Sequence, residues 1–229
     1  MFLLKGDLKE LGGSLNPNNI FELMEYRRVF KKEHPDYFYP DGILVFCGPQ
    51  GSGKTLSAVQ YVRRLCAKYP KAIVCTNMDL EVSAETRVVR WMGVDTFNRL
   101  KNGENGVIYL LDEIHLEFNS LESKRMDVSI FKTVSQQRKQ RIHIVGTSQL
   151  FMRIAKPFRE QFKYCVMCRN LFGSLQINTV IDGTTAKEDN GKLIASSLGT
   201  SIWFHTPRLY GTYDTFAVIK RFTHEGGEL

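Results

Sequence analysis

Four short apolar runs, separated by longer polar segments, organise the middle of the chain. They are ILVFC at 43–47, AIVC at 72–75, VIYLL at 107–111 and IHIV at 142–145. Helical candidates lie between them, at about 55–69 and 122–140. Strands that alternate with helices favour a parallel sheet that is covered on both faces. The expected fold class is therefore α/β, with a mainly parallel central sheet flanked by helices.

The pattern differs on either side of this core. Residues 1–41 are a polar lead-in that contains one helical patch at 20–32, where apolar positions recur at roughly helical spacing. After Phe158 the chain is richer in Thr, Gly and aromatic residues, which predicts extra, partly antiparallel strands joined by turns. We therefore expect three parts. They are an N-terminal extension at 1–41, a core at 42–170 and a C-terminal β-rich extension of the same domain at 171–229.

Composition is ordinary for a soluble globular protein, with 43% hydrophobic and 24% charged residues. No apolar run approaches the ~18 residues that a membrane span requires. The five cysteines are odd in number and two of them lie inside apolar runs, which favours a reduced, intracellular protein over a disulfide framework. Cys165 and Cys168 form a lone CxxC, and a structural zinc needs four ligands, so we interpret them as core or edge thiols.

The excess positive charge is concentrated in one segment. The chain has a net charge of +7, and residues 119–170 hold 11 Lys and Arg against 3 Asp and Glu. The rest of the chain is nearly balanced. A localised basic segment suggests a polyanionic partner, for which DNA is the leading candidate, while a solvated helix face explains the same charges.

A phosphate-binding motif follows the first apolar run. The sequence GPQGSGKT fits G-x-x-x-x-G-K-[ST], with a predicted strand before it and an amphipathic helix after it. Such a loop holds phosphates with backbone N–H groups and with the helix N-terminus. Lys54 is expected to reach the β- and γ-phosphates of ATP, and the Thr55 hydroxyl to ligate Mg²⁺. The candidate nucleotide-binding residues are Gly48, Pro49, Gln50, Gly51, Ser52, Gly53, Lys54 and Thr55.

Two acids follow the third apolar run. Asp112 ends the predicted strand, which is the usual place for a carboxylate that holds Mg²⁺. Glu113 is next to it and is a candidate base for the attacking water. Adjacent acids behind five apolar residues are costly to bury without a nearby cation or donor. A strand end that simply reaches solvent is the other explanation.

The fourth apolar run has a polar residue at one end and cations at the other. Gln149 follows it and would lie at the carboxyl edge of the sheet, near the γ-phosphate. Arg138 and Arg141 precede it, too far from the phosphates of their own subunit to contact them. Either arginine would then act on a neighbouring subunit as an arginine finger. The alternative for both is a cation that stabilises a helix C-terminus.

The segments GPQGSGKT, VIYLLDE and QQRKQRIHIVGTSQ together resemble the zonula occludens toxin family, which belongs to the FtsK–HerA group of DNA-pumping ATPases. This resemblance implies a P-loop NTPase that packages or extrudes DNA as a homo-oligomeric ring, often a hexamer. It also favours Arg138 over Arg141 as the finger. Filamentous-phage members typically carry a membrane helix after the ATPase domain, and this sequence has none, so a soluble packaging ATPase is favoured.

The sequence therefore predicts an ATP- and Mg²⁺-dependent DNA translocation or packaging motor. We expect DNA of unspecified strandedness as its substrate, a capsid or assembly protein as a partner, and a cytoplasmic or virion-associated location. A nucleotide or small-molecule kinase is one alternative, although the Thr/Gly-rich tail is unlike a helical lid. A nucleotide-dependent switch or interaction protein is another, but it has no need of Glu113 and Gln149.

Overall fold

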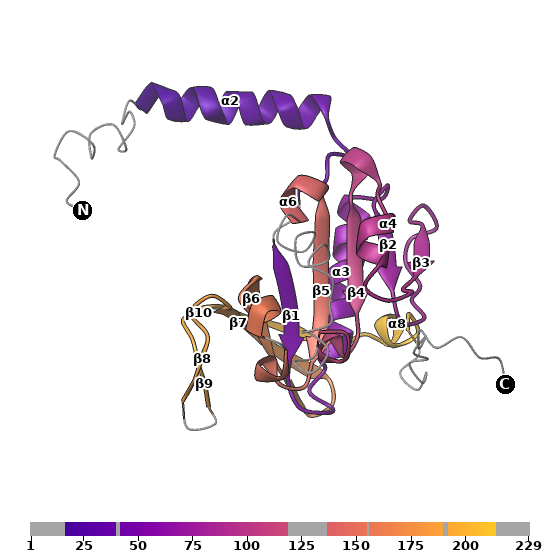
Figure 1. Cartoon of the computed structure of the whole chain (residues 1–229), viewed down its shortest axis with the longest axis vertical. Coiled ribbons are helices and arrows are strands. Elements are labelled where there is room, and N and C mark those ends of the chain that lie inside the picture. Colours follow the sequence, from indigo (N-terminus) through magenta and orange to yellow (C-terminus); the bar gives the residue numbers. More distant parts are fainter. Residues whose placement is uncertain (1–16, 40–41, 119–136, 155, 190–191, 214–229) are drawn as a thin grey trace. The chain divides into compact units, whose positions relative to one another are not determined.

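The computed structural model describes residues 17–39, 42–118, 137–154, 156–189 and 192–213 (Figure 1). The chain divides into two compact units, Met1–Tyr37 and Phe38–Leu229. The three-part division made from the sequence stays a prediction.

The described part of the first unit, residues 17–37, contains one long helix. Helix α2 runs from Pro17 to Glu33 and confirms the helical patch expected at 20–32. The ring of Phe30 stacks on that of His34 at a centroid distance of 4.5 Å, and the His34 N–H donates to the Phe30 carbonyl at 2.9 Å. These contacts stabilise the C-terminal end of the helix.

The second unit is built on an eight-stranded sheet with the order β10-β7-β6-β1-β5-β4-β2-β3. Its strands are β1 (Ile43–Cys47), β2 (Ile73–Thr76), β3 (Val88–Arg90), β4 (Val107–Leu111), β5 (Ile142–Ser148), β6 (Phe162–Leu171), β7 (Leu175–Asp182) and β10 (Ser197–Phe204). A separate two-stranded sheet pairs β8 (Lys187–Asp189) with β9 (Lys192–Ile194).

The centre of the sheet is parallel, as the sequence predicts. Strand β1 lies between β5 and β6 and is parallel to both, and β5 also pairs with β4 in parallel. All four expected strands are present. Strand β5 continues past Val145 to Ser148, because its last three residues still pair with β1. Strand β3 was not expected, since this short edge strand has no apolar run to mark it.

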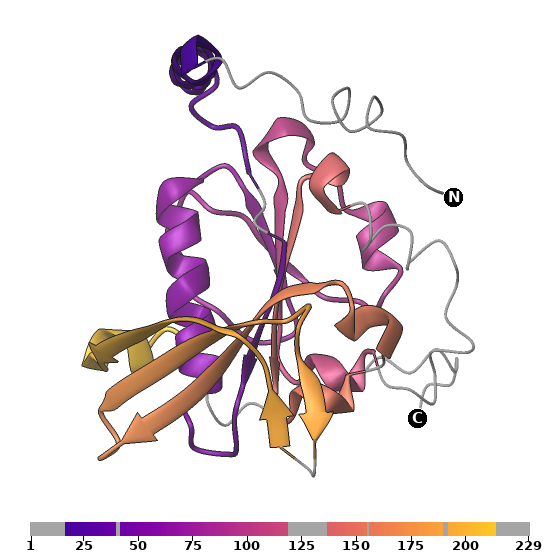
Figure 2. The same cartoon turned by 90° about the vertical axis from the view of Figure 1, so that its left-hand side faces the viewer.

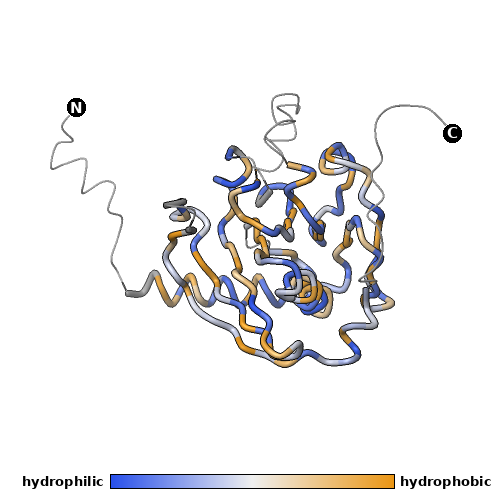
Figure 3. The backbone as a smooth tube through the Cα atoms, turned by 90° about the horizontal axis from the view of Figure 1, so that it is seen from below, coloured by the Kyte–Doolittle hydropathy of each residue, from blue (hydrophilic) through white to orange (hydrophobic). Residues whose placement is uncertain are grey.

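The longest helix in the described residues of this unit is α3 (Lys54–Lys68), which confirms the helix expected at 55–69. It covers one face of the sheet (Figure 2), where Leu56, Val59 and Val62 are buried against strand residues such as Val145. Figure 3 shows both hydrophobic and hydrophilic residues around α3, as expected for a helix with one side against a sheet. Most of the second expected helix, 122–140, lies outside the described residues, apart from α6 (Gln137–Gln140).

The other face of the sheet is covered by short elements and aromatic side chains. Phe97, Tyr109 and Phe118 are fully buried there and pack ring to ring, with Phe118 stacked on Phe158 at 4.4 Å. The short elements of the second unit, on both faces, are α4 (Thr96–Arg99), η1 (Gly103–Asn105), η2 (Ile114–Leu116), η3 (Phe151–Arg153), α7 (Lys156–Arg159) and α8 (Pro207–Tyr210).

The C-terminal part of the sheet is antiparallel, as expected. Strand β7 pairs antiparallel with both β6 and β10, which extends the parallel core on the side of β1. The part of the expected C-terminal extension beyond residue 213 lies outside the described residues. None of the helices that the structure describes is both long and apolar enough to cross a membrane.

Candidate active site

The glycine-rich loop connects the buried strand β1 to α3. Gly53 has φ +78° and directly precedes α3, and a Cβ there would lie 2.0 Å from Gln176 Oε1. Both the left-handed backbone and this close approach require glycine. The helix has no side-chain cap, so the N–H groups of its first turn remain available beside the loop. The loop therefore has the local structure that a phosphate cradle needs.

The first acid after β4 lies against the start of α3. Asp112 Oδ1 accepts hydrogen bonds from Thr55 Oγ1 at 3.0 Å and from Thr147 Oγ1 at 2.6 Å. Thr147 belongs to β5, the strand between β1 and β4, and its side chain is fully buried. The structure thus brings together the two residues expected to hold a metal, although 57 positions separate them in sequence.

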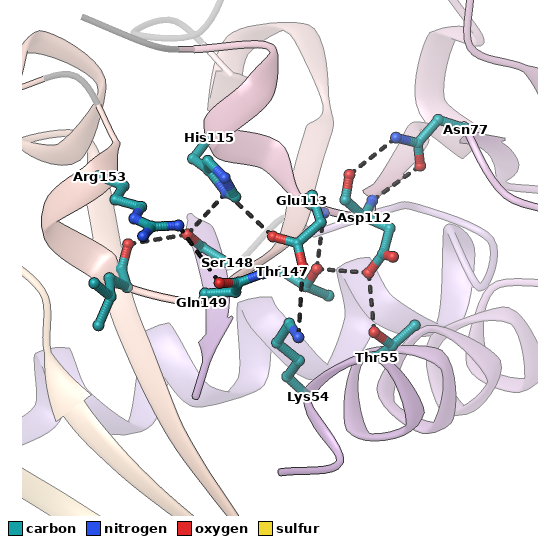
Figure 4. Close-up of polar contacts among 11 residues, drawn as sticks. Lys54, Thr55, Asn77, Asp112, Glu113, His115, Thr147, Ser148, Gln149 and Arg153 are labelled. Carbon is teal, nitrogen blue, oxygen red and sulfur yellow. Dashed lines mark hydrogen bonds and ion pairs between the residues drawn. The ribbon is translucent and has the colours of Figure 1, made fainter. Parts of the chain in front are cut away.

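The backbone of Asp112 is fixed from the next strand of the sheet. Asn77 follows β2 and is 6% exposed. Its Nδ2 donates to the Asp112 carbonyl at 3.0 Å, and its Oδ1 accepts from the Asp112 N–H at 2.9 Å. This reciprocal pair holds the carboxylate at a defined position relative to Thr55 (Figure 4).

Asn77→Ala is therefore expected to lower stability by about 1–3 kcal/mol, because two part-buried backbone groups of Asp112 lose their partner. It should also slow ATP turnover, since Asp112 is released. The matched control is Asn102→Ala. Asn102 also makes two side-chain contacts with the backbone, because its Nδ2 donates to the carbonyls of Lys71 and Gly106, before β2 and β4 begin. Urea unfolding should show a loss of stability in both variants, and an equal loss of turnover in both would contradict the role given to Asn77.

The second acid is paired with the lysine of the loop. Glu113 Oε1 lies 3.4 Å from Lys54 Nζ, and the two side chains are 18% and 10% exposed. Glu113 has φ +50° and ψ +50°, and its N–H donates to Thr147 Oγ1 at 2.9 Å. A left-handed backbone at a non-glycine residue is strained, and such strain concentrates at functional sites. Here it turns the side chain of Glu113 toward Lys54 (Figure 4).

The second carboxylate oxygen of Glu113 has no hydrogen-bond donor among the described residues. Glu113 Oε2 is buried and accepts no hydrogen bond from the described residues. His115 Nδ1 lies 3.2 Å from it, without hydrogen-bond geometry, and also lies 3.2 Å from Ser148 Oγ. Oε2 therefore keeps an unused capacity to accept a hydrogen bond.

Gln149 follows β5 at the same edge of the sheet. Since β4 and β5 are parallel, the residues after both strands lie at one edge. Gln149 is exposed and its Oε1 accepts from an Arg153 guanidinium N–H at 3.4 Å. Its neighbour Ser148 connects this edge to His115 and so to Glu113 (Figure 4).

The two candidate finger arginines lie at the opposite end of β5. Arg138 is part of α6, and the Arg141 carbonyl accepts from the Val107 N–H at 3.0 Å where β4 begins. The seven residues of β5 separate this end from Gln149 by about 20 Å. Neither arginine is brought to the phosphate loop of its own subunit.

Several residues of the site were not found from the sequence. They are Asn77, His115, Thr147, Ser148, Arg153 and Gln176. Asn77 carried one usable signal, because a polar residue after a parallel strand lies at the same edge as Asp112. Thr147 and Ser148 lie within the segment QQRKQRIHIVGTSQ, which gave them no role. The remaining three occupy positions that no motif or periodicity distinguishes.

Thr55 and Asp112 suit a magnesium ion. Mg²⁺ prefers oxygen ligands and is bound by one or two protein groups together with phosphate oxygens and water. The described residues contain no group of three or more His, Cys, Asp or Glu arranged to hold a metal by themselves. The Thr55 hydroxyl and the Asp112 carboxylate, 3.0 Å apart, would supply two protein oxygen ligands. This agrees with the one or two protein groups that Mg²⁺ takes when phosphate and water supply the rest.

The cysteines take no part in the site. All five are buried, and Cys165 and Cys168 lie in β6, as the expectation of core or edge thiols requires. Burial raises the pKa of Cys168 to about 12, and a hydrogen bond with Cys165 together with burial raises the pKa of Cys47. These thiols stay protonated at neutral pH, which disfavours metal binding and nucleophilic chemistry.

A mainly parallel α/β sheet with a glycine-rich loop between β1 and α3 defines the fold of a P-loop NTPase. No family model matches the chain, and a search of curated proteins gives no match. Solved structures do match. The N-terminal domain of zonular occludens toxin from Neisseria meningitidis superposes with a TM-score of 0.52 at 17% identity, covering 77% of this chain and all of the toxin domain.

A second solved structure is the genome packaging NTPase B204 from Sulfolobus turreted icosahedral virus 2 in complex with AMPPCP. It has a TM-score of 0.49 at 14% identity and covers 73% of this chain and 98% of B204. At sequence identities of 17% and 14%, the similarity to these structures shows a shared fold and nothing more specific. The resemblance to the zonula occludens toxin family, noted from the motifs, thus extends to the three-dimensional structure.

Proposed function

We propose that this chain is a Mg²⁺-dependent ATPase that moves DNA, as a packaging or translocation motor. One observation carries the ATPase assignment. The loop lysine and threonine meet the two acids after β4 at the edge where β5 presents Gln149. Phosphate-binding, metal-binding and water-activating groups therefore lie at one edge of one sheet.

The Lys54–Glu113 pair gives a mechanism for coupling binding to catalysis. A triphosphate in the loop competes with Glu113 for the Lys54 ammonium, and it carries more negative charge than one carboxylate. When Lys54 turns to the β- and γ-phosphates, Glu113 loses its cation and becomes free to accept a proton from water. Glu113 thus becomes an effective base only when nucleotide is bound.

Each remaining residue has a role that follows from its place. Thr55 and Asp112 would hold Mg²⁺, which would supply positive charge beside the phosphate oxygens. Gln149, a neutral amide at the edge of β5, orients water or contacts the γ-phosphate. Asn77 and Thr147 hold Asp112, and Thr147 also holds the backbone of Glu113.

The DNA assignment rests on two supports. The excess of Lys and Arg in 119–170 suits a polyanion. The solved structures that match include a virus genome packaging NTPase and a DNA-packaging ATPase, by their own descriptions. In this proposal the chain forms a homo-oligomeric ring, a hexamer as the resemblance to the zonula occludens toxin family implies. Arg138 of one subunit reaches the nucleotide of the next. A capsid or assembly protein docks the ring, in the cytoplasm of a host cell or on the virion.

The ATPase proposal is tested by measuring phosphate release from Mg·ATP without any acceptor substrate. Wild-type protein should release phosphate, whereas a kinase would need an acceptor and a nucleotide switch would turn over very little. Lys54→Ala should weaken ATP binding about tenfold to hundredfold, because it removes a charge-assisted contact to phosphate. Lys68→Ala, at the exposed far end of the same helix, is the matched control. Equal ATP affinity in wild type and Lys54→Ala would defeat the assignment.

A further inference from the structure

A buried glutamine of the C-terminal antiparallel strands contacts the phosphate loop. Gln176 lies in β7, is fully buried, and its Nε2 donates to the Ser52 carbonyl at 3.0 Å. The same nitrogen donates to Asn178 Oδ1 at 2.8 Å. Asn178 Nδ2 in turn donates to Ser57 Oγ on α3 at 3.1 Å. Two neighbouring side chains of β7 therefore hold both the loop and the helix that follows it.

The surrounding acceptors fix the orientation of the Gln176 amide. The Ser52 carbonyl can only accept a hydrogen bond, so the side of Gln176 that faces it must be the NH₂ group. Gln176 Oε1 then points to His205 Nε2, at 3.1 Å, and needs a donor there. His205 must accordingly carry a hydrogen on Nε2.

His205 is itself held on its other side. The Tyr210 hydroxyl, from α8, is hydrogen-bonded to His205 Nδ1 and lies 3.3 Å from the Gly173 carbonyl. Burial lowers the pKa of His205, so its neutral form predominates at neutral pH. Both the neutral tautomer with hydrogen on Nε2 and the protonated ring can donate to Gln176, so this contact survives a change of charge.

The geometry of the peptide bond links this network to phosphate binding. In a planar trans peptide the carbonyl and the next N–H point in opposite directions. Gln176 holds the Ser52 carbonyl toward β7, so the Gly53 N–H is aimed away from β7. Glycine has no side chain to oppose a rotation of that peptide. The hydrogen bond from Gln176 is therefore what keeps this N–H in one direction.

We propose that Gln176 is a positioning residue of the phosphate loop, which keeps the Gly53 N–H directed at bound phosphate, and that His205 and Tyr210 hold Gln176 in the required orientation. The proposal rests on the nucleotide-binding function inferred above. It assigns a role in that site to the antiparallel extension, whose strands would otherwise only enlarge the sheet. It also explains why position 53 must be glycine, because Gln176 Oε1 occupies the space of a Cβ.

The test is the affinity of purified full-length variants for Mg·ATP and for Mg·pyrophosphate, measured by calorimetry. Gln176→Leu should lower the affinity for both ligands by the same factor, about tenfold or more. The reason is that the Gly53 N–H, no longer held in one direction, contacts only the phosphate part of either ligand. Thr179→Val is the matched control. It removes a hydrogen bond between β7 and β10 on the exposed side, where Thr179 Oγ1 lies 3.4 Å from Thr200 Oγ1, and should bind both ligands like wild type.

His205→Phe separates a positioning role from a structural one. In the wild-type background it should lower the affinity for both ligands. In the Gln176→Leu background it should have no added effect, because His205 acts only through the Gln176 amide. Additive losses, or unchanged affinity in Gln176→Leu, would overturn the proposal. If Gln176→Leu does not fold, His205→Phe alone decides, and wild-type affinity in it would overturn the proposal. Wild-type protein that binds neither ligand would instead end the nucleotide-binding function itself.

Discussion

Glu113→Gln is expected to bind Mg·ATP and to hydrolyse it about 10²- to 10⁴-fold more slowly than wild type, the range that a positioned general base contributes. The amide keeps the shape of the side chain but cannot accept the proton of the attacking water. Binding should be retained and even strengthened. In wild type Glu113 competes with phosphate for Lys54, and the neutral amide does not. Single-turnover hydrolysis and equilibrium binding measure the two effects separately.

The control for this variant is Glu85→Gln, the same chemical change at an exposed position outside the site. It should hydrolyse ATP like wild type. Turnover in Glu113→Gln within a few-fold of wild type would assign the base to another residue. A large loss of ATP affinity in this variant would contradict the competition between Glu113 and phosphate for Lys54.

Arg138→Ala is expected to retain ATP binding and to lose about 10³- to 10⁵-fold in turnover, the effect of arginine fingers in other phosphoryl-transfer systems. The physical reason is distance. Arg138 in α6 lies at the far end of β5 from Gln149, so it can stabilise the transition state only in a neighbouring subunit. Mixing Arg138→Ala with Glu113→Gln should restore part of the activity, because some interfaces then combine an intact base with an intact arginine.

Lys139→Ala, the next residue of α6 and exposed, is the control for general loss of charge and should keep most of the turnover. If mixing restores nothing, the arginine does not act between subunits. If Arg141→Ala loses turnover and Arg138→Ala does not, the finger is Arg141, the other candidate that the sequence leaves open.

The sequence predicted the parallel core well because burial on both faces leaves a strong local signal. The run VIYLL becomes β4 with the same bounds, since every one of its residues is buried. The glycine-rich loop was recognisable because its backbone geometry and phosphate chemistry require particular residues at fixed spacing. The pairing of Thr55 with Asp112 also followed, because ligands of parallel sheets meet at the carboxyl edge.

The contacts that hold the site in place could not be read from the sequence. Gln176 contacts Ser52 across 124 positions, and nothing in the alternation of β7 marks that amide as different from a solvated one. Strand β5 was expected to end at Val145 because Gly146, Thr147 and Ser148 are not apolar. Those residues are nevertheless buried, since Thr147 and Ser148 hydrogen-bond to groups at the site. Whether a polar residue is buried depends on hydrogen-bond partners that are distant in the sequence, so the local pattern does not reveal it.

The central claim is that ATP is hydrolysed in a pocket completed by a neighbouring copy, and that this hydrolysis acts on DNA. The most direct measurement is the rate of phosphate release per subunit across a wide range of protein concentration, with single-stranded DNA, with double-stranded DNA and without either. The account predicts a rate per subunit that rises steeply with concentration and increases further with at least one form of DNA. A rate that is constant down to concentrations where the protein is monomeric, and that neither DNA changes, would contradict it.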